Sequence, residues 1–132
     1  MPFKSPVVLL VDGQERSAAM NAIGLLAMGF QPVMSRSTED AFERACKIRP
    51  DVVVADMTAP GVSGVDLTRR LRGDTRTEET AIIVLTGHAL PADRQEVWDA
   101  GCDRFILKPC LPDRLAFEIR DLLHDRRSRT VA

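Results

Sequence analysis

The sequence has few cysteines, no long apolar run and almost no net charge, and each scarcity excludes a class of protein. Its three cysteines, at positions 46, 102 and 110, are odd in number and lack Cys-x-x-Cys spacing, which argues against a disulfide framework and a zinc site. No apolar stretch approaches the roughly 18 residues of a membrane span, and the run that ends at Asp12 is too short for a signal peptide. A net charge of −1 gives no field that attracts nucleic acid or anionic lipid. We therefore expect a cytoplasmic protein with no nucleic-acid or membrane partner.

What the chain does contain is an alternation of apolar, β-branched runs with amphipathic segments, repeated along its whole length. Its 132 residues, 45% hydrophobic and 28% charged, suit one soluble globular domain over residues 1–132. We predict strands at 7–11, 31–35, 52–56, 81–85 and 104–107, and helices at 14–28, 38–50, 64–72, 91–100 and 112–126. Strands that alternate with helices in this way predict an α/β fold, a five-stranded parallel sheet doubly wound by helices on both faces, (βα)5.

Individual residues mark particular points on these helices. Ser37 or Thr38 is expected to cap the second helix, and Ser63 the third, because a serine or threonine oxygen accepts a free backbone N–H at a helix start. Gly24 lies inside the first helix, where glycine costs about 1 kcal/mol relative to alanine. We expect Gly24 to mark a place of close packing.

The prediction of function starts from the stretch at 51–64, D-V-V-V-A-D-M-T-A-P-G-V-S-G. A run that is apolar on both sides suits a central strand of a parallel sheet, and Asp56 ends that run just before a loop. Polar residues also follow three other strands: Asp12, Thr86 and Lys108. Since the carboxyl ends of parallel strands share one edge, where open α/β sheets bind ligands, we expect the four side chains to converge.

Phosphoryl transfer to a carboxylate is the chemistry that these four residue types suit best. Asp56 is placed to act as the nucleophile and form an acyl phosphate. The approach of two anions is eased by Lys108 and by a divalent cation, for which Mg²⁺ fits because it binds through one or two carboxylates and several waters. The Thr86 hydroxyl is placed to donate a hydrogen bond to the transferred phosphoryl group. Each residue alone also has a structural explanation: a helix cap for Asp12, a turn for Thr86 and a surface position for Lys108.

Four motifs carry a resemblance to a known family: V-V-L-L-V-D at 7–12, R-P-D-V-V-V-A-D-M-T-A-P-G-V-S-G at 49–64, L-T-G-H-A-L at 85–90 and D-A-G-C-D-R-F-I-L-K-P at 99–109. With these motifs in this order, the chain resembles a response-regulator receiver domain of two-component signalling. The residues at 85–90 and 100–104 are most similar to those of single-domain regulators and of receivers attached to hybrid sensor kinases. The resemblance implies a flavodoxin-like receiver fold with a core at about 6–125, and we expect a solvated basic tail at 126–132.

The resemblance also implies a role for particular residues at the site. Asp56 matches the phosphoacceptor, and Lys108 matches the lysine that bridges to the phosphate. Asp12 matches the first acid of a pair that holds Mg²⁺, and Thr58 matches the position that offers a backbone carbonyl to the same ion. These matches imply that Asp12, Asp56 and Thr58 form the metal site.

Three further matches concern the change of state that follows phosphorylation. Thr86 matches the switch hydroxyl, and Phe105 matches the aromatic residue that turns inward when the hydroxyl moves toward the phosphate. Pro109 matches a proline that usually follows a cis peptide bond, which proline makes accessible. The resemblance therefore implies an output face formed by residues 91–125.

One position departs from the family, because Gly13 stands where the second acid of the pair is expected. The missing carboxylate predicts weaker Mg²⁺ binding and slower or absent phosphorylation. Its loss also lowers the repulsion around Asp56, so less metal is needed to relieve it, and the sequence leaves open which effect dominates. Glu15, two residues on, is expected to face solvent or help cap the helix rather than replace the ligand.

A few other residues have both a structural and a functional interpretation. Cys110 is expected to be a small apolar filler, and His88 and His124 are expected at the surface. On the helix at 91–100, Val97 and Ala100 suit the side that faces the sheet, which leaves Trp98 toward the flank. A core position is still the default expectation for a tryptophan, and an exposed one there would mark a partner surface on the output face.

The leading hypothesis is a phosphorylation-dependent switch that is not an enzyme. A sensor histidine kinase or histidine phosphotransfer protein is expected to donate to Asp56. No effector domain follows the last helix in this sequence, so output is expected to proceed through another protein, unless the chain is a fragment of a longer one. We expect a monomer or weak dimer. The alternative is a pseudo-receiver that binds a protein partner without phosphorylation, which Gly13 favours. An aspartate-nucleophile phosphatase is disfavoured by Thr58, where such enzymes need a second aspartate, and a nucleotide-binding fold by the lack of a P-loop or G-x-G-x-x-G.

Overall fold

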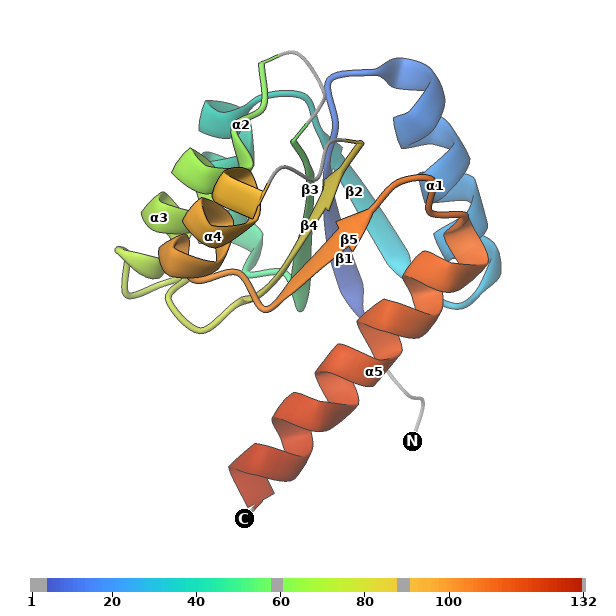
Figure 1. Cartoon of the computed structure of the whole chain (residues 1–132). Helices are drawn as coiled ribbons and strands as arrows, with labels where there is room; N and C mark the ends of the chain where they lie inside the picture. The colour runs from blue at the N-terminus through green and yellow to red at the C-terminus, as the bar shows by residue number, and fades with distance from the viewer. Residues whose placement is uncertain (1–4, 58–60, 88–90, 132) are drawn as a thin grey trace.

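The strands assemble into one parallel sheet, as the alternation predicted. The computed structural model describes residues 5–57, 61–87 and 91–131, and within them the sheet has five strands in the order β2-β1-β3-β4-β5 (Figure 1). The strands are β1 (Val7–Val11), β2 (Gln31–Ser35), β3 (Val52–Asp56), β4 (Ala81–Thr86) and β5 (Arg104–Leu107). The helices are α1 (Glu15–Ala27), α2 (Thr38–Ile48), α3 (Gly64–Arg72), α4 (Pro91–Ala100) and α5 (Pro112–Val131).

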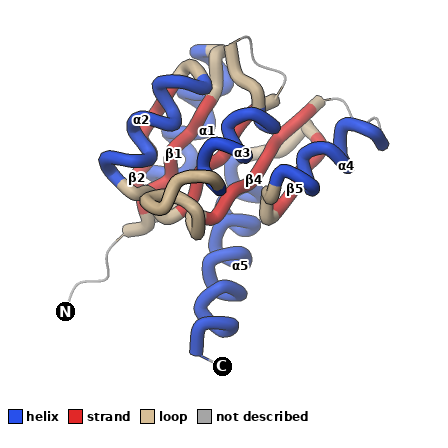
Figure 2. Tube along the Cα trace, turned by 90° about the vertical axis from the view of Figure 1, so that its left-hand side faces the viewer, coloured by secondary structure: helices blue, strands red, loops and turns tan. Residues whose placement is uncertain are grey.

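The helices cover both faces of the sheet, which confirms the doubly wound α/β fold. Helices α1 and α5 lie on one face, and α2, α3 and α4 lie on the other (Figures 1 and 2). Each central strand sends alternate side chains to the two layers, so that Val8 and Leu10 pack toward α1 and α5 while Leu9 and Val11 pack toward α2 and α3. Because both faces are buried, the strands read as continuous apolar runs rather than as alternating ones.

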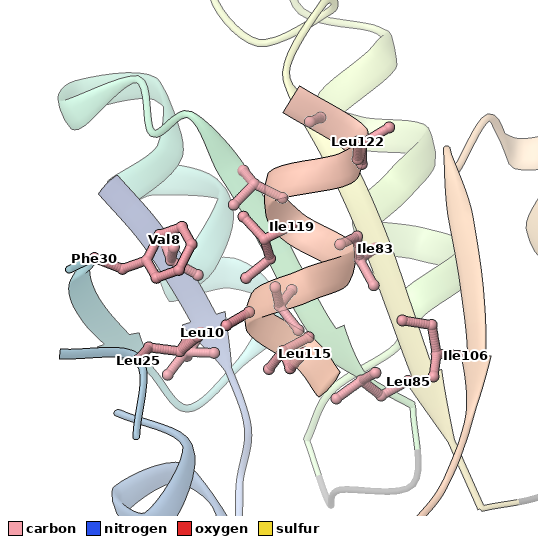
Figure 3. Close-up of a cluster of buried hydrophobic side chains, with 14 residues drawn as sticks. Val8, Leu10, Leu25, Phe30, Ile83, Leu85, Ile106, Leu115, Ile119 and Leu122 are labelled. Atoms are coloured by element: carbon pink, nitrogen blue, oxygen red, sulfur yellow. The ribbon is translucent and has the colours of Figure 1, made fainter. Parts of the chain in front are cut away.

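The layer on the α1 and α5 side contains the larger of the two apolar clusters (Figure 3). Leu25 of α1, Ile83 of β4 and Leu115 and Ile119 of α5 have no exposed surface. Burying one such side chain contributes about 1.5–3 kcal/mol, so this layer supplies much of the free energy that fixes α1 and α5 on the sheet.

Close packing at Gly24 joins the same two helices, as its place in the sequence predicted. A Cβ atom at Gly24 would lie 2.3 Å from Cβ of Pro112, the first residue of α5. The glycine thus allows the start of α5 to rest directly on the backbone of α1. The peptide bond between Lys108 and Pro109, just before this contact, is cis, as the resemblance implied.

Two of the predicted helix caps are present. The Ser37 hydroxyl accepts a hydrogen bond from the Asp40 N–H at 3.1 Å, and the Ser63 hydroxyl accepts one from the Asp66 N–H at the same distance. Each bond satisfies a backbone donor that a helix start leaves free, which explains why α2 and α3 begin where they do.

Helix α5 is longer than the sequence predicted, since it continues past Arg126 to Val131. The prediction of a solvated, frayed tail is wrong for Arg126, whose guanidinium lies 3.3 Å from the Asp103 carboxylate and donates to the Glu79 carbonyl. These contacts join α5 at Arg126 to the loops that precede β4 and β5. Figure 1 shows the helix projecting beyond the sheet.

Arg72, at the end of α3, ties the same loops together. Its guanidinium donates to the carbonyls of Gly101 and Glu78, each at 3.0 Å, and to the Thr80 carbonyl at 2.6 Å. It also lies 3.0 Å from the Asp103 carboxylate. One side chain therefore joins the ends of α3 and α4 to the starts of β4 and β5.

Trp98 does not lie in the core, so the default expectation for it is wrong. It is 46% exposed, whereas its neighbour Val97 is fully buried. Helix α4 buries the position before the tryptophan, and the 100° step to the next residue carries Trp98 out to the flank.

No helix in the described part of the chain is both long enough and apolar enough to cross a membrane.

Candidate functional site

The polar residues that end four strands lie at the same edge of the sheet. The parallel register pairs Val11 with Ala55 across β1 and β3, and pairs Asp56 with Leu85 across β3 and β4. The N–H of Lys108 donates to the carbonyl of Thr86 at 2.7 Å, which brings the residue after β5 to the end of β4. The predicted convergence of these strand ends is therefore present in the fold.

Asp56 and Lys108 form the central contact of this edge. Asp56 is only 4% exposed, and Nζ of Lys108 lies 2.5 Å from its Oδ2 atom although 52 residues separate the two in the chain. A carboxylate this deeply buried needs a charged or hydrogen-bonding partner to be stable in its ionised form. The lysine supplies a positive charge at the place where a second anion would have to approach Asp56.

Asp12 lies at the same edge and also has a structural role. It is 6% exposed, its Oδ1 accepts a hydrogen bond from the Gln14 N–H at 2.8 Å, and its Oδ2 accepts one from the Ser17 hydroxyl. These bonds hold the start of α1 against the end of β1. The helix-start explanation and the site explanation therefore both apply to this carboxylate.

Thr86 and Phe105 share the face of the sheet that α2, α3 and α4 cover. Thr86 is 3% exposed and ends β4, where the alternation of the strand places its side chain on the same side as Val84. Phe105 pairs with Val84 in the register of β4 and β5 and packs, half-buried, against the same apolar cluster. The hydroxyl and the aromatic ring are thus neighbours on one face, a short step along the sheet edge from Asp56.

The donor set at this edge fits Mg²⁺, although with fewer carboxylates than the family pattern implies. Asp12 and Asp56 line one small cavity, and Mg²⁺ commonly binds through one or two carboxylates and several waters. Gly13 adds no ligand, and the described residues contain no group of three or more histidine, cysteine or acidic side chains suited to a metal. Thr58, expected to offer a carbonyl, lies outside the described residues, as does His88.

Glu15 does not join the acidic site. Its side chain is 73% exposed and forms an ion pair with Arg36, so it faces solvent as expected. His124 is also exposed, as predicted. Cys110 packs at the margin of the apolar cluster under α5, where burial raises the pKa of its thiol.

One residue of this site was not predicted from the sequence. Asn21, on the second turn of α1, lines the cavity that Asp12 and Asp56 share. An asparagine within a helix is ordinarily read as a surface residue. Helical spacing could have identified Asn21, because it lies four residues before the buried Leu25 and therefore on the same, inward face of the helix.

Comparisons with known proteins agree with this geometry. Residues 8–120 match the family model described as the response regulator receiver domain. The chain is 27% identical over 118 residues to the polar-differentiation response regulator DivK of Brucella anthropi, covering 89% of this chain and 96% of DivK. The solved receiver domain of a signal transduction histidine kinase from Syntrophus aciditrophicus is 28% identical, with a TM-score of 0.83 and 92% of each chain covered.

A further structural relative shares the fold and contains a metal. The receiver domain of sensor histidine kinase PA1611 from Pseudomonas aeruginosa is 23% identical, has a TM-score of 0.82 and covers 91% of this chain and 98% of its own. That structure has a magnesium ion coordinated in its active site cleft. The similarities thus extend over almost the whole sheet and include both a stand-alone regulator and domains of kinases.

Proposed function

The chain belongs to the response regulator receiver domain family, and from this premise we propose that it is a phosphorylation-dependent switch with Asp56 as phosphoacceptor. Receiver domains are signalling switches, generally not enzymes, that interact with histidine kinases or phosphotransfer proteins. In this chain the donor is a phosphohistidine of such a partner. The single observation that carries the proposal is the contact of Lys108 with the buried Asp56.

The transfer moves one phosphoryl group from nitrogen to oxygen. A carboxylate oxygen of Asp56 attacks the phosphorus, a P–O bond forms, and the P–N bond to the partner's imidazole breaks so that the electron pair returns to the imidazole nitrogen. Because the new acyl phosphate carries more negative charge than the carboxylate, Lys108 stabilises both the transition state and the product.

Magnesium has a defined place in this proposal. Asp12 and Asp56, with the backbone carbonyl of Thr58, would hold the ion, which when bound neutralises charge on the transferring group. The absence of a side-chain ligand at Gly13 weakens this binding relative to a receiver with two adjacent acids. We therefore expect phosphorylation that needs high Mg²⁺ concentrations and proceeds slowly.

The response to phosphorylation involves the face covered by α4. We propose that the Thr86 hydroxyl donates to the phosphoryl group and that Phe105 fills the space it leaves, which shifts the population of conformers at residues 91–125. Two exposed aromatic side chains on this part of the chain, Trp98 and Phe117, suit contact with an output protein. We further propose a cytoplasmic monomer or weak dimer that uses neither nucleic acid nor membrane.

Incubation with acetyl phosphate and Mg²⁺, followed by intact mass measurement, tests the switch directly. The wild-type protein is expected to gain the mass of one phosphoryl group, and the Asp56→Asn variant is expected to gain none. Equal labelling of the two proteins, or labelling of neither over a wide range of Mg²⁺ concentration, contradicts the proposal.

The second candidate function is a pseudo-receiver that docks on a protein partner without phosphorylation. Gly13 favours it, together with the engagement of both Asp12 oxygens by Gln14 and Ser17. A chain that stays unlabelled yet adopts one stable fold, and binds its partner equally well as wild type and as Asp56→Asn, would identify this function.

A further inference from the structure

Thr38, the first residue of α2, is 6% exposed, and its hydroxyl is not the one that caps the helix. The cap is Ser37, whose hydroxyl accepts the Asp40 N–H. Oγ1 of Thr38 instead accepts a hydrogen bond from the Ser63 N–H at 2.9 Å and lies 3.5 Å from the Gly61 carbonyl oxygen. The backbone N–H of Thr38 donates to the same Gly61 carbonyl at 3.1 Å. One residue of α2 therefore binds the end of the loop that follows β3.

This loop begins directly after Asp56 and is anchored at two places. At its start, the Met57 N–H donates to the Leu85 carbonyl of β4 at 2.8 Å. Its end leads into α3, which lies beside α2 on one face of the sheet, so that Thr38 can reach it (Figures 1 and 2). Fixing the ends of a loop reduces the number of conformations that remain to the residues between them.

The start of α2 is also bonded to the other side of the acidic site. The Asp12 N–H donates to the Ser35 carbonyl at 2.9 Å, and the Ser35 hydroxyl donates to the Asp40 carboxylate at 2.6 Å. Asp40 lies in the first turn of α2, close to Thr38 in the chain. Hydrogen bonds from this one turn therefore reach both the end of β1 at Asp12 and the loop that follows Asp56.

We propose that Thr38 is a positioning residue, whose hydroxyl fixes the loop after Asp56 relative to α2. Its consequence for metal binding rests on the proposed function, in which a backbone carbonyl of this loop, at Thr58, joins Asp12 and Asp56 as a ligand. Because Gly13 brings no carboxylate, that carbonyl is one of the three proposed protein ligands, and its placement matters more than in a site with a further acid. The anchoring of the loop does not depend on phosphorylation.

Hydrogen exchange of the Ser63 amide tests the anchor without metal or phosphoryl donor. Thr38→Val keeps the shape of the side chain but removes the oxygen that accepts the Ser63 N–H, so native-state exchange at Ser63 should become roughly tenfold faster. Thr38→Ser keeps the hydroxyl and should exchange at close to the wild-type rate. Exchange at the wild-type rate in Thr38→Val would overturn the proposal.

Thr77→Val is the matched control for this measurement. Thr77 is also buried, and its hydroxyl donates to the Leu71 carbonyl at 2.8 Å, at the opposite end of α3 from Ser63. The substitution deletes one buried hydroxyl, as Thr38→Val does, and therefore shows how a loss of stability alone affects exchange. We expect the Ser63 rate in Thr77→Val to stay close to that of wild type. An increase as large as in Thr38→Val would overturn the proposal.

Calorimetric titration with Mg²⁺ separates positioning from stability. We expect the dissociation constant of Thr38→Val to rise roughly fivefold, the factor that corresponds to the loss of one hydrogen bond, and those of Thr38→Ser and Thr77→Val to match wild type. Thr38→Ser loses a buried methyl group but keeps the bond to Ser63, so a merely structural role would not predict its recovery. An affinity of Thr38→Val within about twofold of wild type, or an equal loss in Thr38→Ser, overturns the positioning role.

The outcomes for Thr38 and for the proposed function are separable. If the wild-type protein binds no Mg²⁺ and gains no phosphoryl group from acetyl phosphate, the proposed function fails. Faster Ser63 exchange in Thr38→Val, reversed in Thr38→Ser, would then still support the anchoring of the loop. If the wild-type protein is phosphorylated but Ser63 exchange does not respond to Thr38→Val, the proposed function stands and this inference is wrong.

Discussion

A methyl group added at Gly24 measures how tightly α1 and α5 are packed. In Gly24→Ala the new Cβ would lie 2.3 Å from Cβ and 2.9 Å from Cγ of Pro112, whereas carbon atoms in contact prefer about 3.5–4.0 Å. The two helices must therefore separate by about 1 Å or more at this point. The Pro112 ring is fused to the backbone and cannot rotate away, so the start of α5 itself has to move.

Two opposing terms set the size of the effect. Replacing glycine by alanine inside a helix favours folding by up to about 1 kcal/mol. Overpacking typically costs about 1–3 kcal/mol, and here it also disturbs the contacts of fully buried Leu25 and Leu115. Because the obstacle is backbone and ring rather than a flexible side chain, we expect the unfavourable term to dominate, with a net loss of about 1–2 kcal/mol.

Thermal and urea unfolding provide the measurement. The expected loss corresponds to a decrease in Tm of roughly 4–8 °C for a chain of this size. Ala19→Gly, on the exposed side of α1, calibrates the helix-propensity term alone and should cost about 1 kcal/mol. Pro112→Gly removes the opposing Cβ, so Gly24→Ala should become favourable in that background. A Gly24→Ala protein that is more stable than wild type would refute the reasoning.

Three further predictions address the site. Lys108→Ala should slow acetyl phosphate labelling roughly tenfold or more, because it removes the cation beside Asp56; labelling at the wild-type rate, followed by intact mass, would contradict the role of the lysine. Gly13→Asp adds a third carboxylate to the site, and because the backbone φ at Gly13 is not positive, an aspartate can adopt the same backbone conformation. The Mg²⁺ affinity should therefore rise roughly tenfold in calorimetric titration. Equal affinity of the two proteins would show that the missing acid does not matter. Burial raises the pKa of the Cys102 thiol to about 12, so at pH 8 about one molecule in ten thousand carries the thiolate and iodoacetamide should spare Cys102 until the protein unfolds. Rapid alkylation of native protein at that cysteine, mapped by peptide mass, would show that the thiol is accessible.

The sheet and the convergence of the site were predictable because both follow from local sequence. β-Branched runs such as Val52–Val54 favour extended backbone, and apolar residues at every position of a run require cover on both faces. Once the strands are parallel, their carboxyl ends share an edge, which brings Asp56 and Lys108 together without any knowledge of the loops. The chemistry of a carboxylate beside a lysine suggested phosphoryl transfer to Asp56, and the resemblance implied the same roles for the two residues.

The features that the sequence did not reveal depend on contacts between distant segments. Arg126 joins α5 to partners that lie far away in the chain, Asp103 and Glu79, at separations of 23 and 47 residues. Asn21 escaped attention because an amide in a helix has no pattern of its own until the facing strand ends are known.

The guanidinium of Arg72 has a consequence for where the molecule can change shape. By bonding to Gly101, Thr80 and Asp103, it fastens the entry points of β4 and β5 to each other and to the end of α3. Asp56 lies at the opposite rim, where β3 ends. We therefore expect a conformational change at Asp56 to leave in place the rim that Arg72 anchors.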